Sequence, residues 1–205
     1  MNIAFFGSTG RVGLELASFL TEAGQPFKAL VRFPEKLHAL GNAEIIEGNA
    51  RNLVDVERTV AGCKTIISCL NTDGNDTLSV SMEIILDAAR KHGVERMITV
   101  GTAGILQSRN DSSLYRFQSN ESKRRSTRAA EEHAKVYEML RESDLNWTIA
   151  CPTYLPDGKL TGIYRSEEDV LPDGGTSISV QDTAHFVFHE WQNPRYTGKR
   201  VGLAY

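Results

Sequence analysis

The sequence predicts an α/β fold built on a doubly wound, mostly parallel sheet with helices on both faces. Short apolar runs alternate with amphipathic stretches along the chain, which is typical of a parallel sheet that is buried on both sides. The 205 residues can bury one substantial core, whereas two full domains would be cramped. We therefore expect one domain over residues 1–205, with a small C-terminal substrate-side elaboration at 152–180.

The expected strands recur at regular intervals. Apolar, β-branched runs place them at residues 2–6, 27–31, 43–47, 64–69, 95–100 and 146–151, with a weaker strand at 176–180 and another at 200–204.

Two helices are marked by apolar stripes of helical period. The first stripe, which ends near Gly24, consists of Val12, Leu16, Phe19 and Leu20. The second, which closes near Gly93, consists of Leu78, Met82, Ile85, Leu86 and Ala89.

One long segment, residues 107–128, is polar, serine-rich and poor in apolar residues. Such a segment inside a compact domain is usually either a mobile lid or disordered, and its place after the fifth strand favours a lid over a site. The basic cluster of Lys123, Arg124, Arg125 and Arg128 precedes a helix and is best explained as a solvated charge run, with a bound anion as the alternative.

Charge and cysteine content narrow the function classes. A net charge of −3 and a pI near 6 give no reason to bind nucleic acid or an anionic membrane, so a small-molecule partner is expected. Cys63, Cys69 and Cys151 lack the CxxC spacing of metal sites and fit reduced thiols. With no signal-peptide pattern, we expect a cytoplasmic protein that is a monomer or weak homo-oligomer.

A glycine-punctuated turn, Gly7-Ser-Thr-Gly10-Arg-Val-Gly13, follows the first strand and leads into the first helix. Glycines allow close approach of the backbone, and a helix N-terminus offers N–H groups and a positive dipole end to an anion. The turn therefore predicts a cradle for the pyrophosphate of a dinucleotide, although its GxxGxxG spacing differs from the commoner GxGxxG. A glycine-rich turn without a ligand is the alternative.

Arg32 ends the second strand, where the adenosine ribose of such a cofactor would lie. An NAD-selective site commonly has an acidic residue there, whereas a guanidinium suits a 2′-phosphate through charge-assisted hydrogen bonds. We therefore expect NADP(H) rather than NAD. A solvated surface charge is the alternative for Arg32 considered alone.

The remaining site residues follow from the rule that ligands of open α/β sheets bind outside the carboxyl ends of the strands. The expected cofactor contacts in the loops at those ends are Gly7, Ser8, Thr9, Gly10, Arg11, Val12, Arg32, Asn49, Ala50, Cys69, Leu70, Asn71, Gly101, Thr102, Cys151, Pro152 and Thr153. Asn49 is expected to reach the adenine amine. On the acceptor side we expect Thr102, Tyr154 and Leu155.

A missing pair of residues indicates the reaction type. Alcohol dehydrogenases of the short-chain type need a tyrosine activated by a lysine four residues later, and no tyrosine of this sequence has one. Without a positioned phenol to protonate an alkoxide, reduction of a ketone is disfavoured. We expect an acceptor that takes hydride without a strong enzyme acid, such as an oxidised flavin or a linear tetrapyrrole.

Thr102 and His133 are the candidate catalytic residues, although a histidine on an apolar helical face is usually a hydrogen-bonded core or cleft-edge residue. His185 and His189 have the i, i+4 spacing of metal ligands, but no third ligand accompanies them, so we expect no metal. Asp182 is expected to cap their helix.

The sequence resembles the atypical short-chain dehydrogenase/reductase group of Rossmann-type proteins, and within it the biliverdin-IXβ reductase/flavin reductase family. The matching stretches are residues 7–13, 29–32, 59–62, 91–94, 140–143, 160–164 and 178–182, with His185 and Phe186. The resemblance implies NADPH lying across the sheet ends and a broad pocket that stacks the acceptor on the nicotinamide. It also implies that Thr102 replaces a serine beside the nicotinamide, that Tyr154 replaces a pocket histidine of the mammalian members, and that His133 matches a family histidine.

The expected function is an NADPH-dependent reductase that passes hydride to a flat conjugated acceptor, either a flavin such as FMN or riboflavin or a biliverdin-type tetrapyrrole. A non-catalytic NADP(H)-sensing module of the NmrA-like type shares the glycine motif and is the alternative. An isomerase or epimerase that uses the cofactor transiently is disfavoured, because acid–base work at a sugar carbon usually needs the absent tyrosine.

Overall fold

The computed structural model describes residues 3–34, 43–122 and 126–205 of the chain. The strands are β1 (Ile3–Phe6), β2 (Phe27–Val31), β3 (Ala43–Glu47), β4 (Thr65–Ser68), β5 (Arg96–Val100), β6 (Asn146–Pro152), β7 (Arg165–Glu168) and β8 (Lys199–Ala204). The helices are α1 (Arg11–Glu22), α2 (Leu53–Val60), α3 (Thr77–His92), α4 (Arg128–Arg141) and α5 (Val180–Gln192), with 3-10 turns η2 (Ala103–Ile105) and η3 (Arg116–Gln118).

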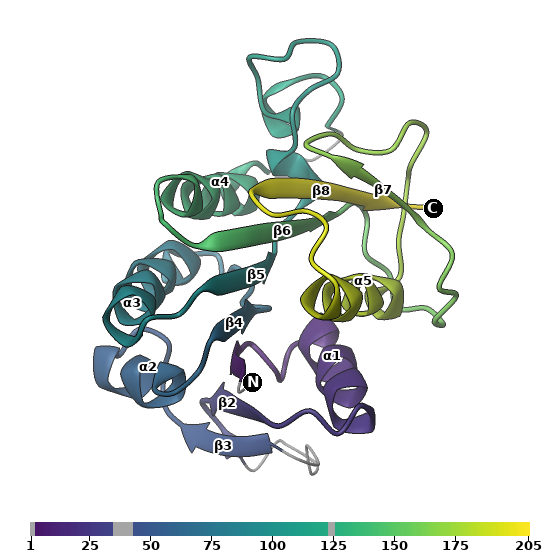
Figure 1. The fold of residues 1–205 in the computed structure, drawn as a ribbon. Coiled ribbons are helices and arrows are strands. Elements are labelled where there is room, and N and C mark those ends of the chain that lie inside the picture. Colours follow the sequence, from purple (N-terminus) through teal and green to yellow (C-terminus); the bar gives the residue numbers. More distant parts are fainter. Residues whose placement is uncertain (1–2, 35–42, 123–125) are drawn as a thin grey trace.

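The strands form one sheet with the order β3-β2-β1-β4-β5-β6-β8-β7 (Figure 1). All neighbouring strands pair in parallel except β7, which is antiparallel to β8. The chain runs outward from β1 to β3 and then returns to start β4 on the other side of β1, so the strand order reverses between β1 and β4. This topology confirms the predicted doubly wound α/β fold, and it places the ligand crevice at the carboxyl ends of β1 and β4.

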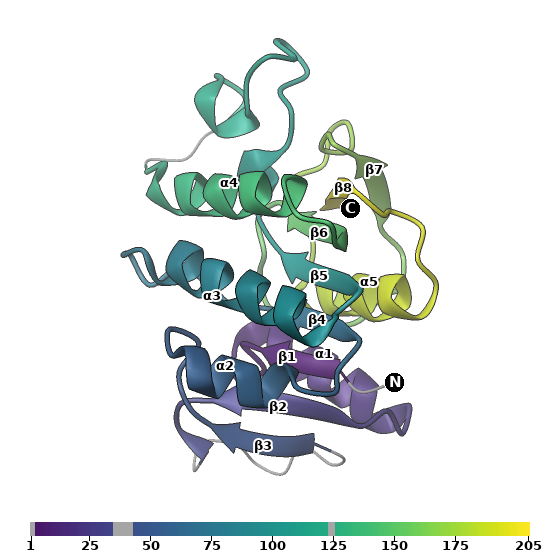
Figure 2. The ribbon, with the colours of Figure 1, turned by 60° about the vertical axis from the view of Figure 1, so that its left-hand side comes forward.

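Helices cover both faces of the sheet (Figures 1 and 2). Helices α1 and α5 pack together on one face, and α2, α3 and α4 lie on the other. Successive residues of the central strands alternate between the two cores: Phe5 and Ile67 are buried beneath α1 and α5, whereas Phe6 and Ile66 are buried beneath α2 and α3. Because both faces are buried, the central strands are largely apolar, which is the pattern that made them predictable.

One predicted strand is wrong, and one observed strand was not predicted. Residues 176–180 form no strand among the described residues: Ser177 makes a single bridge with Tyr154, and α5 begins at Val180. Instead, β7 (Arg165–Glu168) forms the edge of the sheet. Its sequence, Arg-Ser-Glu-Glu, carries no apolar residue, because an edge strand that is exposed to solvent needs none, and the sequence therefore gives no signal for it.

The part of the polar segment that the structure describes, residues 107–122, has a defined turn structure that projects beyond α4 (Figure 2). A bridge pairs Gln107 with Tyr115, and the Tyr115 hydroxyl donates a hydrogen bond to Glu138 of α4. The Arg200 guanidinium lies 4.2 Å from the centroid of the Tyr137 ring and 5.7 Å from that of Tyr115. These contacts anchor the base of the segment to α4 and β8. Of the predicted basic cluster, Lys123, Arg124 and Arg125 lie outside the described residues, and Arg128 is the first residue of α4.

No helix among the described residues is long and apolar enough to cross a membrane.

Candidate active site

The glycine turn after β1 has the geometry of a phosphate cradle. Gly7 has a φ of +78°, and a Cβ at this position would lie 2.5 Å from the backbone carbon of Cys69. A Cβ at Gly13 would lie 2.1 Å from the carbonyl oxygen of Gly7. Both positions therefore exclude any side chain: Gly7 lets the turn approach the end of β4, and Gly13 lets α1 approach the turn.

Gly10 has a different role. It is the N-cap of α1, and because glycine has no side chain, it makes no capping hydrogen bond to the first turn of the helix. A Cβ at Gly10 would lie 3.4 Å from the Gly7 carbonyl oxygen, so the protein itself tolerates one more readily here than at Gly7 or Gly13. An uncapped first turn leaves backbone N–H groups and the positive end of the helix dipole available to an anion. The turn therefore fits a pyrophosphate.

Ser8, Thr9 and Val12 complete the predicted phosphate contacts. Ser8 is fully buried, and its Oγ has no hydrogen-bond partner among the described residues. An unpaired buried hydroxyl costs roughly 1–3 kcal/mol, a cost that a ligand oxygen would relieve by accepting from it. Thr9 is exposed, and Val12 of α1 is buried in the core between α1, α5 and the sheet.

Arg11 is engaged by the protein rather than pointing freely into the crevice. Its Nε and Nη2 donate to the Asp157 carboxylate at 2.9 and 2.6 Å, and Nη2 also donates to the Leu155 carbonyl at 2.9 Å. The side chain thus joins the first turn of α1 to the loop that follows β6. It is predicted to contact the cofactor, and in the structure it connects the phosphate turn with the acceptor-side loop.

Arg32 lies at the same edge as the glycine turn. Phe6 pairs with Leu30 in the β1–β2 register, so the residues after Phe6 and those after Val31 leave the sheet side by side. Arg32 is exposed, its guanidinium carbon lies 5.9 Å from the Phe33 ring centroid, and it makes no ion pair with a described residue. Its charge is therefore available to a ligand phosphate.

The loop after β3 lies next to Arg32, since the Gly48 N–H donates to the Val31 carbonyl at 3.0 Å. Asn49 is exposed, and its Oδ1 accepts from the Arg51 N–H at 3.0 Å, which fixes a local turn. Ala50 is buried behind it. The predicted adenine contact would therefore come from an amide whose oxygen already has one partner.

The loop after β4 forms the other wall of the crevice. The Cys69 N–H donates to the Phe6 carbonyl at 2.8 Å, and Leu70 packs against the core while Asn71 is exposed. Burial raises the pKa of the Cys69 thiol to about 12, and burial raises that of Cys151, at the end of β6, to about 12 as well. Both thiols are neutral near pH 7, so they contribute packing rather than reactivity.

The two candidate catalytic side chains lie on adjoining elements. Thr102 follows Gly101 at the end of β5, is 6% exposed, and its Oγ1 accepts from the Gly104 N–H at 3.4 Å as the N-cap of η2. His133 is 7% exposed on α4, which packs against η2. Both residues are largely buried, and their catalytic roles stay a prediction.

A pocket of about 710 Å³ opens beyond the ends of β5 and β6. Four segments supply its lining: Ala103 and Gly104 from η2, Arg109, Arg116, Glu121 and Ser122 from the polar segment, Thr153 and Tyr154 from the loop after β6, and residues 171–176. Tyr154 is 71% exposed, and its predicted contact with the acceptor stays a prediction. Leu155 is not part of the lining and packs instead on the core beneath α1 and α5.

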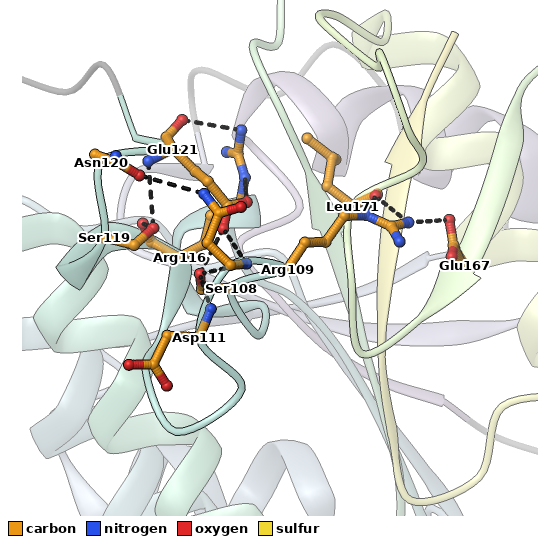
Figure 3. A network of polar contacts seen from close by, with 10 residues as sticks. Ser108, Arg109, Asp111, Arg116, Ser119, Asn120, Glu121, Glu167 and Leu171 are labelled. Atoms are coloured by element: carbon orange, nitrogen blue, oxygen red, sulfur yellow. Dashed lines mark hydrogen bonds and ion pairs between the residues drawn. The ribbon is translucent and has the colours of Figure 1, made fainter.

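The polar segment supplies the charged wall of the pocket (Figure 3). Arg109 donates to the Leu171 carbonyl at 2.9 Å and to Glu167 at 2.7 Å, which connects the segment with β7. The Glu121 carboxylate accepts hydrogen bonds from the Ser108 hydroxyl and, at 3.2 Å, from the Asn110 N–H. Sequence reasoning missed these residues, because a polar segment shows no periodicity that would indicate which side chains turn inward.

The stretch at 160–164 is held by a buried carboxylate. Asp182 is fully buried and accepts from the Thr161 N–H, the Gly162 N–H and the Tyr205 hydroxyl at 3.0, 2.8 and 2.6 Å. The N-cap of α5 is Ser179, whose Oγ accepts from the Asp182 N–H at 2.9 Å, so the prediction that Asp182 caps this helix is wrong. Asp182 lies one turn later and binds the neighbouring loop instead.

The two spaced histidines of α5 contact each other and a tyrosine. His185 Nε2 lies 2.9 Å from His189 Nε2, and His185 Nδ1 lies 2.9 Å from the Tyr164 hydroxyl. Within the described ranges, no group of three potential metal ligands is found.

Comparison with known proteins agrees with this geometry. The family model described as NAD(P)H-binding matches residues 7–194, a span that begins at the glycine turn. A candidate epimerase from Bacteroides thetaiotaomicron has 26% sequence identity and a TM-score of 0.87, over 100% of this chain and 96% of that one. A candidate NADH-flavin reductase from Streptococcus pneumoniae has 21% identity and a TM-score of 0.84, over 100% and 99%.

The anaerobilin reductase ChuY from Escherichia coli O157:H7 has 22% identity and a TM-score of 0.83, over 100% of this chain and 97% of that one. At such identities the shared feature is the fold, and the family assignment comes from the model that matches most of the chain. The glycine turn, the reversal of strand order beside it and this match together show that the chain belongs to the NAD(P)H-binding family.

Proposed function

We propose that the protein is an NADPH-dependent reductase that transfers hydride to a flat conjugated acceptor, either a flavin such as FMN or riboflavin or a biliverdin-type tetrapyrrole. The observation that carries the proposal is the 710 Å³ pocket at the ends of β5 and β6, on the side of the sheet where the nicotinamide of a cofactor seated on the glycine turn would arrive. Its volume suits a ligand of several fused or linked rings.

The bound cofactor would supply the hydride, and the chain's own residues bind and orient it. The backbone of the glycine turn and the first turn of α1 would hold the pyrophosphate. Arg32 would bind the 2′-phosphate, which is the basis for proposing NADPH rather than NADH. Gly101, Thr102, Pro152 and Thr153 would border the nicotinamide, with Thr102 positioned by its bond to the Gly104 N–H.

Tyr154 is the tyrosine that lines the described pocket, and it is followed four residues later by Gly158 rather than by a lysine. Tyr115 and Tyr164 lie outside this lining: the Tyr115 hydroxyl bonds to Glu138, and the Tyr164 hydroxyl contacts His185. The pocket lining therefore does not present a phenol activated as in the Tyr–Lys pair of an alcohol dehydrogenase. The site therefore favours an acceptor that delocalises the arriving charge and takes its proton from water.

Two proteins of similar structure are named as reductases of such acceptors: one as a candidate NADH-flavin reductase and the other as an anaerobilin reductase. Their names support the proposed substrate class. Both likenesses lie near one-fifth identity, so they support the reductase proposal only together with the pocket. The candidate epimerase shares the fold, but this chain lacks the tyrosine–lysine pair that acid–base work at a sugar carbon usually requires.

The test is to mix the purified protein with NADPH and FMN, riboflavin or biliverdin and to follow the loss of nicotinamide absorbance. Turnover with at least one acceptor is expected, faster with NADPH than with NADH. Tight NADPH binding without turnover of any acceptor would contradict the proposal and favour a cofactor-sensing module.

A further inference from the structure

Two arginines line the acceptor pocket, and their guanidinium groups are engaged to different extents. Arg109 donates through Nε and Nη2 to the Leu171 carbonyl at 3.2 and 2.9 Å, and through Nη2 to Glu167 at 2.7 Å. Figure 3 shows its guanidinium directed at these two partners. Arg109 therefore connects the polar segment to the edge of the sheet, and its charge is already neutralised.

Arg116 is held more loosely. Its Nη2 donates to the Glu121 carbonyl at 3.2 Å, and its Nε lies 3.6 Å from Glu121 Oε2, which is an ion pair without the distance of a hydrogen bond. A guanidinium has five N–H donors, and the remaining ones of Arg116 make no hydrogen bond to a described residue. The side chain is only 21% exposed, so these donors lie within the pocket wall rather than in bulk water.

The loose pairing has a structural cause. Glu121 Oε1 is occupied by the Ser108 hydroxyl and the Asn110 N–H, and these bonds lower the pKa of the carboxyl despite its partial burial. These bonds hold the carboxylate in the turn, where its other oxygen lies 3.6 Å from Arg116 Nε and makes no two-pronged pair with the guanidinium. A guanidinium that is oriented but incompletely paired is suited to receive a ligand anion.

We infer that Arg116 binds an anionic tail of the acceptor, so that the pocket takes a flat conjugated ring system carrying a phosphate or carboxylates in preference to its uncharged counterpart. The inference rests on the proposed reductase function and defines its substrate class further. The position of the residue supports it: Ala103, Gly104 and Thr153 line the part of the pocket beside the ends of β5 and β6, whereas Arg116 belongs to the segment that forms the outer wall. A ring system bound beside Ala103, Gly104 and Thr153 would direct its anionic tail toward Arg116.

FMN and riboflavin provide the sharpest comparison, because both carry the same isoalloxazine ring and differ by one phosphate. Binding is measured by titrating each flavin and following its fluorescence, and turnover by NADPH oxidation. Wild-type protein is expected to bind FMN about tenfold or more tighter than riboflavin, since a charge-assisted bond is lost with the phosphate. Biliverdin and its dimethyl ester form the corresponding pair for carboxylates.

Arg116→Gln is expected to remove most of the preference for FMN while leaving the affinity for riboflavin nearly unchanged. Arg116→Lys should keep part of the preference, because it retains the charge without the planar fork. Arg90→Gln is the matched control: Arg90 is an exposed helix residue paired with Asp87, and its loss makes the same change in net charge. Glu121→Gln removes the competing carboxylate and should strengthen FMN binding alone.

The outcomes separate the two proposals. Equal binding of the charged and uncharged members of both pairs, or equal losses for FMN and riboflavin in Arg116→Gln, would overturn the role of Arg116 even if turnover occurs. A preference for the anion that depends on Arg116, without any turnover, would support this role and remove the reductase proposal. If Arg116→Gln does not fold, Arg116→Lys and Glu121→Gln decide the question, and an unchanged FMN preference in both counts against it.

Discussion

The two halves of the site are built in different ways. On the cofactor side, the cradle consists of backbone from one short stretch, and its shape is fixed by where side chains are impossible, at Gly7 and Gly13. On the proposed acceptor side, the pocket is assembled from four segments that are distant in sequence. The cofactor half is thus defined by local geometry and the acceptor half by long-range packing, so changes in the two halves should have separable effects.

The largest effect is expected for Gly13→Ala. A Cβ there would lie 2.1 Å from the Gly7 carbonyl oxygen, so the turn must move, at a cost of about 1–3 kcal/mol in unfolding free energy. NADPH binding should be lost at concentrations that saturate the wild type, as measured by fluorescence titration. Gly24→Ala is the control, because Gly24 has a φ of +65° but no neighbour within 4 Å of a Cβ. Unchanged NADPH affinity in Gly13→Ala would show that the turn is not the cradle.

The next largest effect is expected for Arg32, which would contact the cofactor at its adenosine ribose. Arg32→Ala should weaken NADPH binding by about 1.5–3 kcal/mol, tenfold or more, through the loss of charge-assisted bonds. NADH binding should hardly change, because NADH has no 2′-phosphate. Calorimetric titration of both cofactors measures the difference, and equal losses for the two would contradict a phosphate-binding role for Arg32.

Asp182 lies outside the pocket lining and holds the loop at 160–164, so Asp182→Asn should destabilise the fold by about 1–2 kcal/mol at neutral pH while leaving NADPH affinity unchanged. Burial raises the pKa of the Asp182 carboxyl, but the hydrogen bonds from Tyr205, Thr161 and Gly162 lower this pKa by more than burial raises it. The pKa in the folded protein is therefore below the ordinary 3.8. The unfolded chain therefore takes up the proton first. The stabilisation is present above about pH 3.8 and is lost as the pH falls through the lower native pKa.

Chemical denaturation between pH 2 and 7 tests this sign, since the variant should lose less stability than the wild type across the acid range. Asp87→Asn, which removes an exposed carboxylate in an i, i+3 pair with Arg90, serves as the control. A drop in NADPH affinity in Asp182→Asn would show that the loop at 160–164 is coupled to the cradle.

The smallest effect is expected for Thr102→Ala, at the boundary between the halves. The substitution removes the cap of η2 and should cost about 0.5–2 kcal/mol in stability. Turnover should fall with only a modest change in cofactor affinity, and Thr102→Ser should restore it. If steady-state rates of Thr102→Ala equal those of the wild type, Thr102 is part of the scaffold only.

The contrast also explains what could be predicted from the sequence. The cradle could be predicted from the sequence because Gly7, Gly10 and Gly13 are close together in it. The parallel strands around them could be predicted because they are largely apolar on both faces. Register then places Arg32 beside the turn, since β1 and β2 pair in parallel. These features follow from short-range patterns and from the handedness of connections in α/β folds.

The acceptor half could be predicted only in part. Tyr154 lines the pocket because it follows a strand end, and its contact with an acceptor stays a prediction. Leu155 turns into the core, and Arg11 bonds to the loop after β6. Arg116 and Glu121 are brought to the pocket by a network of turns whose bonds depend on tertiary contacts with α4 and β8. No periodicity encodes such contacts.

The two outer strands of the sheet bear on how copies of the protein meet. β7 has the sequence Arg-Ser-Glu-Glu, and β3 at the opposite margin carries Glu44 and Glu47, both exposed. Unpaired backbone at a sheet margin invites another chain to add a strand, and charged side chains oppose this, because two identical margins would bring like charges together. Continuous sheets across molecules, and the fibrous aggregation that they seed, are therefore disfavoured at both margins.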